Sequence, residues 1–344
     1  MRMLLYGQLV SKVLCAAVRL GVPEALSGGG RRVAEVAREV GAHTVALHRL
    51  LRALASFDVV EEADGAFSLT SLGSTLLPDT PGTAHPTAML LANEVGATWA
   101  EFDHTLRTGD SAFRHLHGSS LFDHLERQPE RRTDFDLSQE AGLRLELDEI
   151  FEFVTFDRYQ SIVDVGGGNG HLMCELLHRT PGSSGVILDL SGTVSLAEKR
   201  VAEEELTHRC TALAGDFFIE VSPGADLYIL SHVLHDWGDE DAVKILRTCA
   251  SAMPDSGRLM VIDLAMTSPT APAGTSRAPG GGEGSRHLPA LMDLYMLSLF
   301  GAAGGRERTT DEFVALLSRA GLDAEDISVL PSGMAVITAR AHIS

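Results

Sequence analysis

The stretch SHVLHDWGDE, residues 231–240, places two histidines and an aspartate directly after the apolar run ADLYIL. Such a run is typical of a buried strand, and open α/β sheets place their chemistry at the carboxyl ends of their strands. An imidazole with an ordinary pKa of about 6.5 can accept a proton at neutral pH. His232, His235 and Asp236 are therefore candidate site residues. The alternative is a histidine that is merely satisfied by a backbone carbonyl at a strand end.

A glycine-rich turn forms a second candidate site, in SIVDVGGGNGHLMCELLHR, residues 161–179. Glycines let a ligand approach the backbone, and the helix that follows offers unpaired N–H groups at its amino end. His171 stands where the dinucleotide fingerprint needs its third glycine, and no GK[ST] follows for a phosphate loop. The next run, VILDL, ends at Asp189, twenty-one residues after Gly168, where a carboxylate can bind ribose hydroxyls. The pattern favours a ribose-bearing ligand over an exposed aspartate at a strand end.

A sheet must position both sites, and the sequence after residue 160 predicts one. Strand-like runs alternate with helical patterns, and the chain closes with DISVLPSGMAVITARA, two strands joined by a Pro-Ser-Gly turn. This alternation predicts an α/β fold with a doubly wound, mostly parallel sheet that carries one antiparallel strand. Periodicity does not reveal the order of the strands.

The first eighty residues predict a mainly helical unit that resembles a winged helix. Residues 31–57 carry apolar positions at helical spacing in two blocks with a break at Gly41, and Asp64-Gly65 is a hairpin signal. Winged-helix units often bind DNA. Here eight basic residues face eight acidic ones, so no positive field would attract nucleic acid. A packing or dimerisation role is the better interpretation.

The composition excludes further classes of protein. The chain has 344 residues, 44% of them hydrophobic and 22% charged, which is typical of a soluble globular protein. A net charge of −19 would repel nucleic acids and anionic membranes. Polar residues interrupt the apolar amino end, so we expect an amphipathic helix and no membrane span. The four cysteines lie far apart without a CxxC pair, which indicates free thiols in the cytoplasm.

Five motifs in order resemble those of the small-molecule O-methyltransferases that use S-adenosylmethionine (SAM). They are DVGGGNG, Asp189-Leu190, GDFF at 215–218, VLHDWGDE at 233–240 and GGRERT at 304–309. The resemblance implies a class I SAM-dependent methyltransferase fold, SAM as the methyl donor, and a homodimer that interlocks through amino-terminal helices. It implies a dimerisation domain over 1–80, a helical connecting and substrate-lining segment over 81–150, and a SAM-binding catalytic domain over 151–344.

The resemblance also assigns roles to single residues. The residues implied to contact SAM are Gly166, Gly167 and Gly168 at the methionine part, Asp189 and Leu190 at the ribose, Asp216 and Phe217 at the adenine, and Ser231 and Trp237 in the pocket wall. His235 matches the family's general base, and Asp263 and Glu307 match the acids that flank it. The chemistry suits these residue types, because a phenol with a pKa of about 10 must lose its proton as its oxygen attacks the SAM methyl group.

The acceptor is predicted to be a flat aromatic or polyketide hydroxyl compound of bacterial secondary metabolism. Candidates for the wall of its pocket are His232, Trp99, Phe122, Met292 and Met296, although methionines at such positions are more often plain core. Two departures from the family stand out. Gln139 and Leu143 replace a Met and a Ser that contact SAM, and residues 267–289 form a Pro/Gly/Ser-rich insertion, expected to be a mobile loop that is a linker or a lid.

Three alternatives remain open. A metal-dependent C-methyltransferase of an α-keto acid could use a two-His, one-carboxylate set drawn from His232, His235, Asp236 and His287. Met292 stands where such enzymes carry their second metal-binding His, so no metal is predicted. A SAM-binding hydroxylase or decarboxylase on the same scaffold would differ in the mass of its product. A winged-helix regulator would need a basic recognition helix, which the charge count disfavours.

Overall fold

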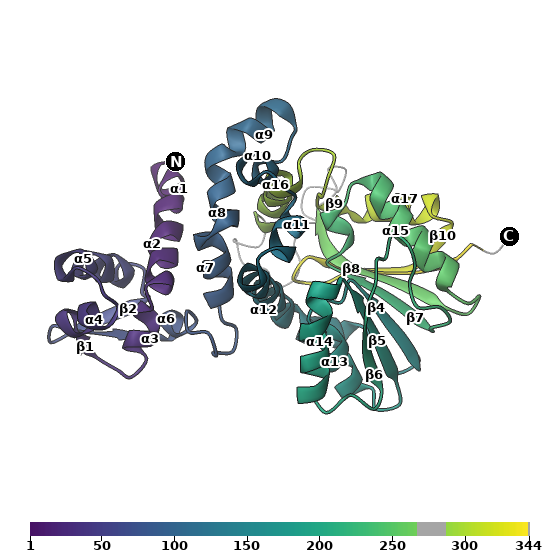
Figure 1. Ribbon diagram of the computed structural model, residues 1–344, viewed down its shortest axis with the longest axis horizontal. Coiled ribbons are helices and arrows are strands. Elements are labelled where there is room, and N and C mark those ends of the chain that lie inside the picture. The colour runs from purple at the N-terminus through teal and green to yellow at the C-terminus, as the bar shows by residue number, and fades with distance from the viewer. Residues whose placement is uncertain (267–286, 343–344) are drawn as a thin grey trace. The chain divides into compact units, whose positions relative to one another are not determined.

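The protein, described here by a computed structural model, forms two compact units (Figure 1). The structure describes residues 1–266 and 287–342. The first unit comprises Met1–Ala100 and Glu130–Leu145, and the second comprises Glu101–Pro129 and Glu146–Ser344. Residues 267–286 of the predicted insertion lie outside the described residues, whereas Leu288 and Pro289 begin a helix. The domain boundaries at residues 80 and 150 stay a prediction.

The first unit is mainly helical and contains a small sheet in the order β1-β3-β2. Its elements are α1 (Arg2–Leu5), α2 (Gly7–Arg19), α3 (Val22–Leu26), β1 (Arg31–Arg32), α4 (Val33–Glu39), α5 (Thr44–Ala55), β2 (Val60–Ala63), β3 (Ala66–Leu69), α6 (Ser71–Ser74), α7 (His85–Ala92), α8 (Glu94–Thr98) and part of α12 (Pro129–Phe153). The 3-10 helix η1 (Trp99–Glu101) follows α8. Asp64 and Gly65 have φ of 52° and 75°, the left-handed conformation of a tight two-residue hairpin turn. The predicted helix pair and hairpin are therefore confirmed.

The second unit is built on a sheet in the order β10-β11-β8-β7-β4-β5-β6. Its helices are α9 (Phe102–Thr108), α10 (Ala112–His117), α11 (Leu121–Glu126), α13 (His171–Arg179), α14 (Ser191–Glu203), η2 (Leu234–Asp236), α15 (Asp239–Ala252), α16 (Leu288–Phe300) and α17 (Thr310–Arg319). Its strands are β4 (Ser161–Val165), β5 (Ser184–Asp189), β6 (Cys210–Ala214), β7 (Leu227–Ser231), β8 (Arg258–Met266), β9 (Arg308–Thr309), β10 (Leu322–Val329) and β11 (Met334–Ala341). Strand β11 runs antiparallel to β8 and β10, and β9 pairs with β8. The predicted mostly parallel sheet with one antiparallel strand is confirmed.

Helices cover both faces of this sheet. On one face, Val163 of β4 and Tyr228 of β7 share a core with Leu246 of α15 and Phe313 of α17. On the other face, Ile162 and Ile229 are fully buried as well, and α13 and α14 pack beside β5 (Figure 1). Because both faces are covered, the central strands are mostly apolar, as their sequences predict.

The strand order reverses at β4. The chain proceeds from β4 through β5 to β6 on one side and returns to β7 and β8 on the other. Ligands of open α/β sheets bind at the carboxyl ends of the strands beside such a reversal. The loops that follow β4 and β7 are the glycine turn and the histidine stretch, so both candidate sites meet at one edge of the sheet.

Among the described residues, no helix combines the length and the apolar character needed to cross a bilayer. The four cysteines are free thiols, and all are buried.

Candidate active site

The glycine turn after β4 forms a cradle that admits no side chains at two of its positions. A Cβ atom on Gly166 would lie 2.8 Å from the Val233 side chain, and one on Gly167 would lie 2.7 Å from the carboxylate of Asp164. Gly168 differs, because a Cβ there would meet no atom within 4 Å. Its φ of 57° is left-handed. The third glycine therefore exposes bare backbone to open space, which suits close approach of a ligand.

Asp189 ends β5 beside this cradle. Its carboxylate accepts hydrogen bonds from the backbone N–H of Gly168 over 2.8 Å and of Leu190 over 2.7 Å. The residue thus ties the glycine turn to the loop after β5. A carboxylate in this place can also accept hydrogen bonds from a ribose.

Asp164 is a polar residue of the cradle that the sequence analysis missed. It lies within β4 and is 1% exposed, and its Oδ2 has no hydrogen-bond partner in the described part of the chain. Burial, and to a smaller extent the charge of Asp189, raise the pKa of Asp164 to about 7. The buried Oγ of Ser231, at the end of β7, likewise has no hydrogen-bond partner within the described ranges. The signal available in the sequence was one acid inside the apolar strand SIVDV.

Aromatic side chains gather beside the cradle. Trp237 lies edge-on to Phe217 and Phe218, with ring centroids 5.9 and 4.6 Å away. Phe122 of α11 lies 6.1 Å from Trp237 in a stacked orientation. Asp216 accepts a hydrogen bond from the backbone N–H of Phe218 over 2.8 Å, which fixes the turn that carries these rings. A polar cradle next to an aromatic wall fits a nucleoside-containing ligand such as SAM.

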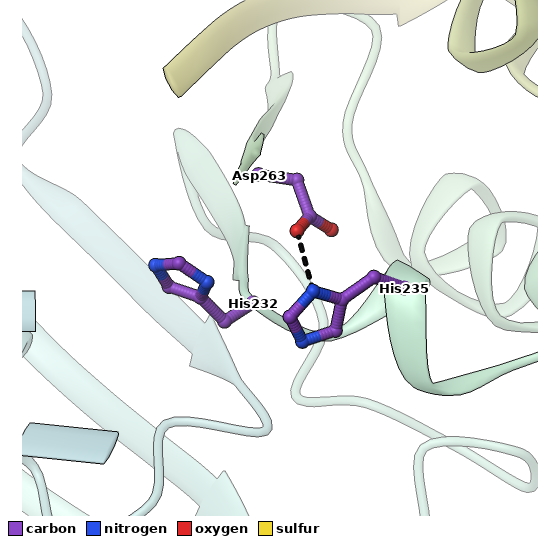
Figure 2. Close-up of side chains that lie close together, drawn as sticks. All are labelled: His232, His235 and Asp263. Carbon is purple, nitrogen blue, oxygen red and sulfur yellow. Dashed lines mark ion pairs between the residues drawn. The ribbon is translucent and has the colours of Figure 1, made fainter. Parts of the chain in front are cut away.

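His235 lies in η2 and is 4% exposed, and Figure 2 shows its ring directed towards the carboxylate of Asp263. Its Nδ1 lies 3.0 Å from Oδ1 of Asp263 on β8 and 3.4 Å from Oε1 of Glu307, and its Nε2 lies 3.7 Å from Oδ1 of Asp236. These contacts are ion pairs, because neither ring nitrogen has a partner in hydrogen-bond geometry among the described residues. The structure thus brings His235 together with both acids that the sequence assigned to it. Asp236 is a third.

Burial and charge act against each other on the pKa of His235. Burial by itself lowers the pKa, but the carboxylates of Asp263 and Asp236 outweigh it and raise the pKa well above 6.5. Burial raises the pKa of Asp263 in turn, but the His235 imidazolium outweighs burial and lowers it. Burial raises the pKa of Asp236 to about 7. The carboxylates therefore favour the protonated imidazole, and a cationic ligand close to the ring would oppose this effect.

The motif GGRERT holds the loop that carries His235. A Cβ atom on Gly305 would collide with the backbone carbonyl of His235, so this glycine permits direct contact between two backbones. Arg308 is fully buried, and its guanidinium donates to the carbonyls of Leu234 and Trp237 over 2.6 and 2.7 Å. Glycines and arginine together fix the residues on either side of the imidazole.

His232 lies next to this cluster. Its Nε2 is 2.8 Å from Oε2 of Glu146, and its ring centroid is 5.5 Å from that of His235. Donor atoms of His232, His235 and Asp263 all lie within 4.8 Å of one another, a spacing that could hold a metal ion. His287, an exposed residue before α16, does not belong to this group, and the carboxylate of the group comes from Asp263 instead of Asp236.

The remaining candidates for the acceptor pocket lie on helices. Met296 is buried and Met292 is half-buried on α16, which packs against β8 and η2. Trp99 begins η1 in the first unit. Gln139 and Leu143, the departures from the family pattern, lie on the part of α12 that belongs to the first unit.

Two family models match the chain. One, described as an O-methyltransferase domain, matches residues 99–323. The other, described as an O-methyltransferase dimerisation domain, matches residues 3–79.

Individual relatives match over nearly the whole length. The O-methyltransferase SfmM3 of Streptomyces lavendulae is 44% identical over 98% of this chain and 99% of its own. The crystal structure of LaPhzM superposes with a TM-score of 0.90 at 31% identity, covering 99% of this chain and 98% of that one. NcsB1 from neocarzinostatin biosynthesis, solved with SAM and 2-hydroxy-5-methyl naphthoic acid, superposes with a TM-score of 0.81 at 31% identity, covering 96% of each chain.

Proposed function

Because the chain belongs to the O-methyltransferase family, we propose that it transfers the methyl group of SAM to a hydroxyl of a small aromatic secondary metabolite, with His235 as the general base. The chain is a SAM-dependent methyltransferase and carries a dimerisation domain over residues 3–79. The acceptor class and the roles of single residues are the proposal.

The donor site is the cradle at the carboxyl ends of β4 and β5. Gly168 faces open space, and Gly166 and Gly167 are needed because a side chain at either position would clash with neighbouring atoms. Asp189 would accept hydrogen bonds from the ribose, Asp216 and Phe217 would hold the adenine, and Trp237 would form part of the pocket wall. The buried Ser231 Oγ and Asp164 Oδ2 are polar atoms that a ligand or its water could satisfy.

One observation carries the assignment of the base. Asp263 and Glu307 lie 3.0 and 3.4 Å from Nδ1 of His235, whereas the carboxylate that pairs with Nε2, that of Asp236, lies farther away, at 3.7 Å. An imidazole oriented by carboxylates through one nitrogen can accept a proton at the other, and the carboxylates stabilise the imidazolium that results. SAM supplies an electrophilic methyl group, whose bond to sulfur breaks as its bond to the acceptor oxygen forms. The hydroxyl proton passes to Nε2 of His235.

The acceptor pocket is proposed to be apolar and to suit a flat ring. Phe122, Met292 and Met296 would form its wall, with Trp237 between it and the donor site. NcsB1 was solved with a hydroxynaphthoic acid, a compound of the kind proposed. We place the enzyme in the cytoplasm, since its thiols are free and all buried.

The test is the mass and structure of the product. SAM with a deuterium-labelled methyl group should give a product that has gained one labelled methyl, and NMR should place that methyl on oxygen. A gain of oxygen or a loss of carbon dioxide would favour the hydroxylase or decarboxylase. A methyl on carbon whose formation stops on treatment with a chelator would favour the metal-dependent enzyme.

A further inference from the structure

His232 has a strained and well-defined position. Its φ is 53°, a left-handed conformation that residues other than glycine seldom adopt and that often marks functional sites. Its backbone N–H donates to the carbonyl of Ile262 on β8 over 2.9 Å, which holds the turn against the sheet. The strain directs the imidazole towards the neighbourhood of His235.

Glu146 of α12 fixes the ring of His232. Its carboxylate accepts from Nε2 over 2.8 Å, so the proton of that nitrogen faces away from the catalytic cluster. Figure 2 shows the other ring nitrogen, Nδ1, on the side that faces His235 and Asp263. In both histidines, therefore, a carboxylate orients the ring through one nitrogen, and the other nitrogen can form a hydrogen bond with a ligand.

We propose that His232, held by Glu146, binds an oxygen substituent adjacent to the hydroxyl that is methylated. The acceptors favoured by this site are then aromatic hydroxyl compounds with a carboxylate or carbonyl group at the neighbouring ring position. This inference rests on the proposed function, because it places the reacting hydroxyl at His235.

The geometry and the charges agree with such a ligand. A hydroxyl oxygen and an oxygen of a carboxylate or carbonyl group on the adjacent ring carbon, each at a hydrogen-bond distance of about 3 Å from its own imidazole, fit between rings whose centroids are 5.5 Å apart. The charged groups that interact with His232 include Glu146, Asp263, His235 and Asp236. Burial and His235 lower the pKa of His232, but the carboxylates of Glu146 and Asp263 outweigh them and raise it. A protonated imidazole donates hydrogen bonds from both nitrogens, which suits a carboxylate or carbonyl oxygen, because such an oxygen accepts hydrogen bonds and cannot donate them.

The test compares two isomers of hydroxynaphthoate on the enzyme loaded with S-adenosylhomocysteine. In one the hydroxyl and the carboxylate are adjacent, and in the other they are separated, so charge and size stay equal. Calorimetry should show about tenfold tighter binding of the adjacent isomer, the size expected of one charge-assisted hydrogen bond. In His232→Asn, which tolerates the left-handed backbone, the ratio should fall below about threefold. Glu146→Gln should lower the ratio to an intermediate value, and it replaces the first variant if that one does not fold.

A second histidine–glutamate pair in the same unit provides the matched control. His178 lies 3.0 Å from Glu204, away from the site, so His178→Asn and Glu204→Gln should leave the isomer ratio unchanged. Equal affinities of the two isomers for the wild type, or an unchanged ratio in His232→Asn, would overturn the inference. Methyl transfer is measured separately: isomer selectivity in binding without any methylation would count against the proposed function and not against the role of His232.

Discussion

Arg308 donates a hydrogen bond from Nη1 to the backbone carbonyl of Leu234 over 2.6 Å, directly before His235 in the chain. From Nη2 it reaches the carbonyl of Trp237 over 2.7 Å and the carboxylate of Asp239 over 2.9 Å. One fully buried guanidinium thus holds both ends of the turn that carries the imidazole. The neighbouring residue, Glu307, contacts that imidazole itself.

We therefore expect Arg308 to position the base. Arg308→Lys keeps the charge but cannot make the forked contacts, so kcat should fall by about tenfold or more while the affinity for SAM changes by less than about threefold. The acid limb of the pH–rate profile should also move, because the carboxylates around His235 would shift. Arg319→Lys, which alters an exposed pair with Glu240, is the control. A folded Arg308→Lys enzyme with an unchanged kcat and pH profile would contradict this role.

Removal of the imidazole tests the general base directly. His235→Gln should lower kcat by about 10²- to 10⁴-fold, because the acceptor proton would lose its recipient. Binding of S-adenosylhomocysteine should remain within a few fold of the wild type, since the glycine cradle and Asp189 are untouched. Full turnover of a phenolic acceptor by this variant would show that positioning alone suffices.

The raised pKa of His235 predicts a dependence of SAM binding on pH. Without ligand, the imidazole keeps its proton to a pH well above 6.5. A sulfonium brought close to it disfavours the imidazolium, so SAM binding should release part of a proton and grow tighter as the pH rises towards that pKa. S-adenosylhomocysteine has a neutral sulfur and should show a much smaller effect. Calorimetry in buffers of different ionisation enthalpy measures the protons released, and His235→Gln should abolish the difference between the two ligands.

The glycine cradle predicts a specific loss of SAM affinity. Gly168→Ala places a methyl group in the open space where the donor is expected, at a backbone φ of 57°. Gly321→Ala is a matched control, since its φ is 80° and a Cβ there also meets nothing within 4 Å. Both variants should lose about 1 kcal/mol of stability from the left-handed backbone. Only the first should weaken SAM binding, by about tenfold or more; equal SAM affinities in the two would remove Gly168 from the donor site.

The amino-terminal helices predict a dimer contact. Leu4 and Leu5 of α1 are 78% and 69% exposed, an apolar surface within the dimerisation domain. Leu4→Asp combined with Leu5→Asp should shift the protein towards the monomer in sedimentation velocity, because the charges would lose their hydration in the interface. Ile219→Asp, at an exposed position of the second unit, should leave the dimer intact. A stable dimer in the double variant would place the contact elsewhere.

The sequence by itself predicted the order of the elements and the candidate site residues. Periodicity and turn residues act locally, so the hairpin at Asp64-Gly65, the alternation of strands and helices, and the closing antiparallel strand could all be predicted. The motifs likewise pointed to His235, Asp263 and Glu307, which lie up to about seventy residues apart.

Only the tertiary structure decided which of these residues meet and in what state. The reversal of strand order at β4 brings the loops after β4 and β7 to one edge, and strand order depends on pairings between distant residues that no local pattern records. Folding also buries Asp164, which raises its pKa. It likewise brings His232 into contact with Glu146, eighty-six residues away in the chain. The charge and orientation of a side chain are set by the atoms around it, and those neighbours are known only once the chain has folded.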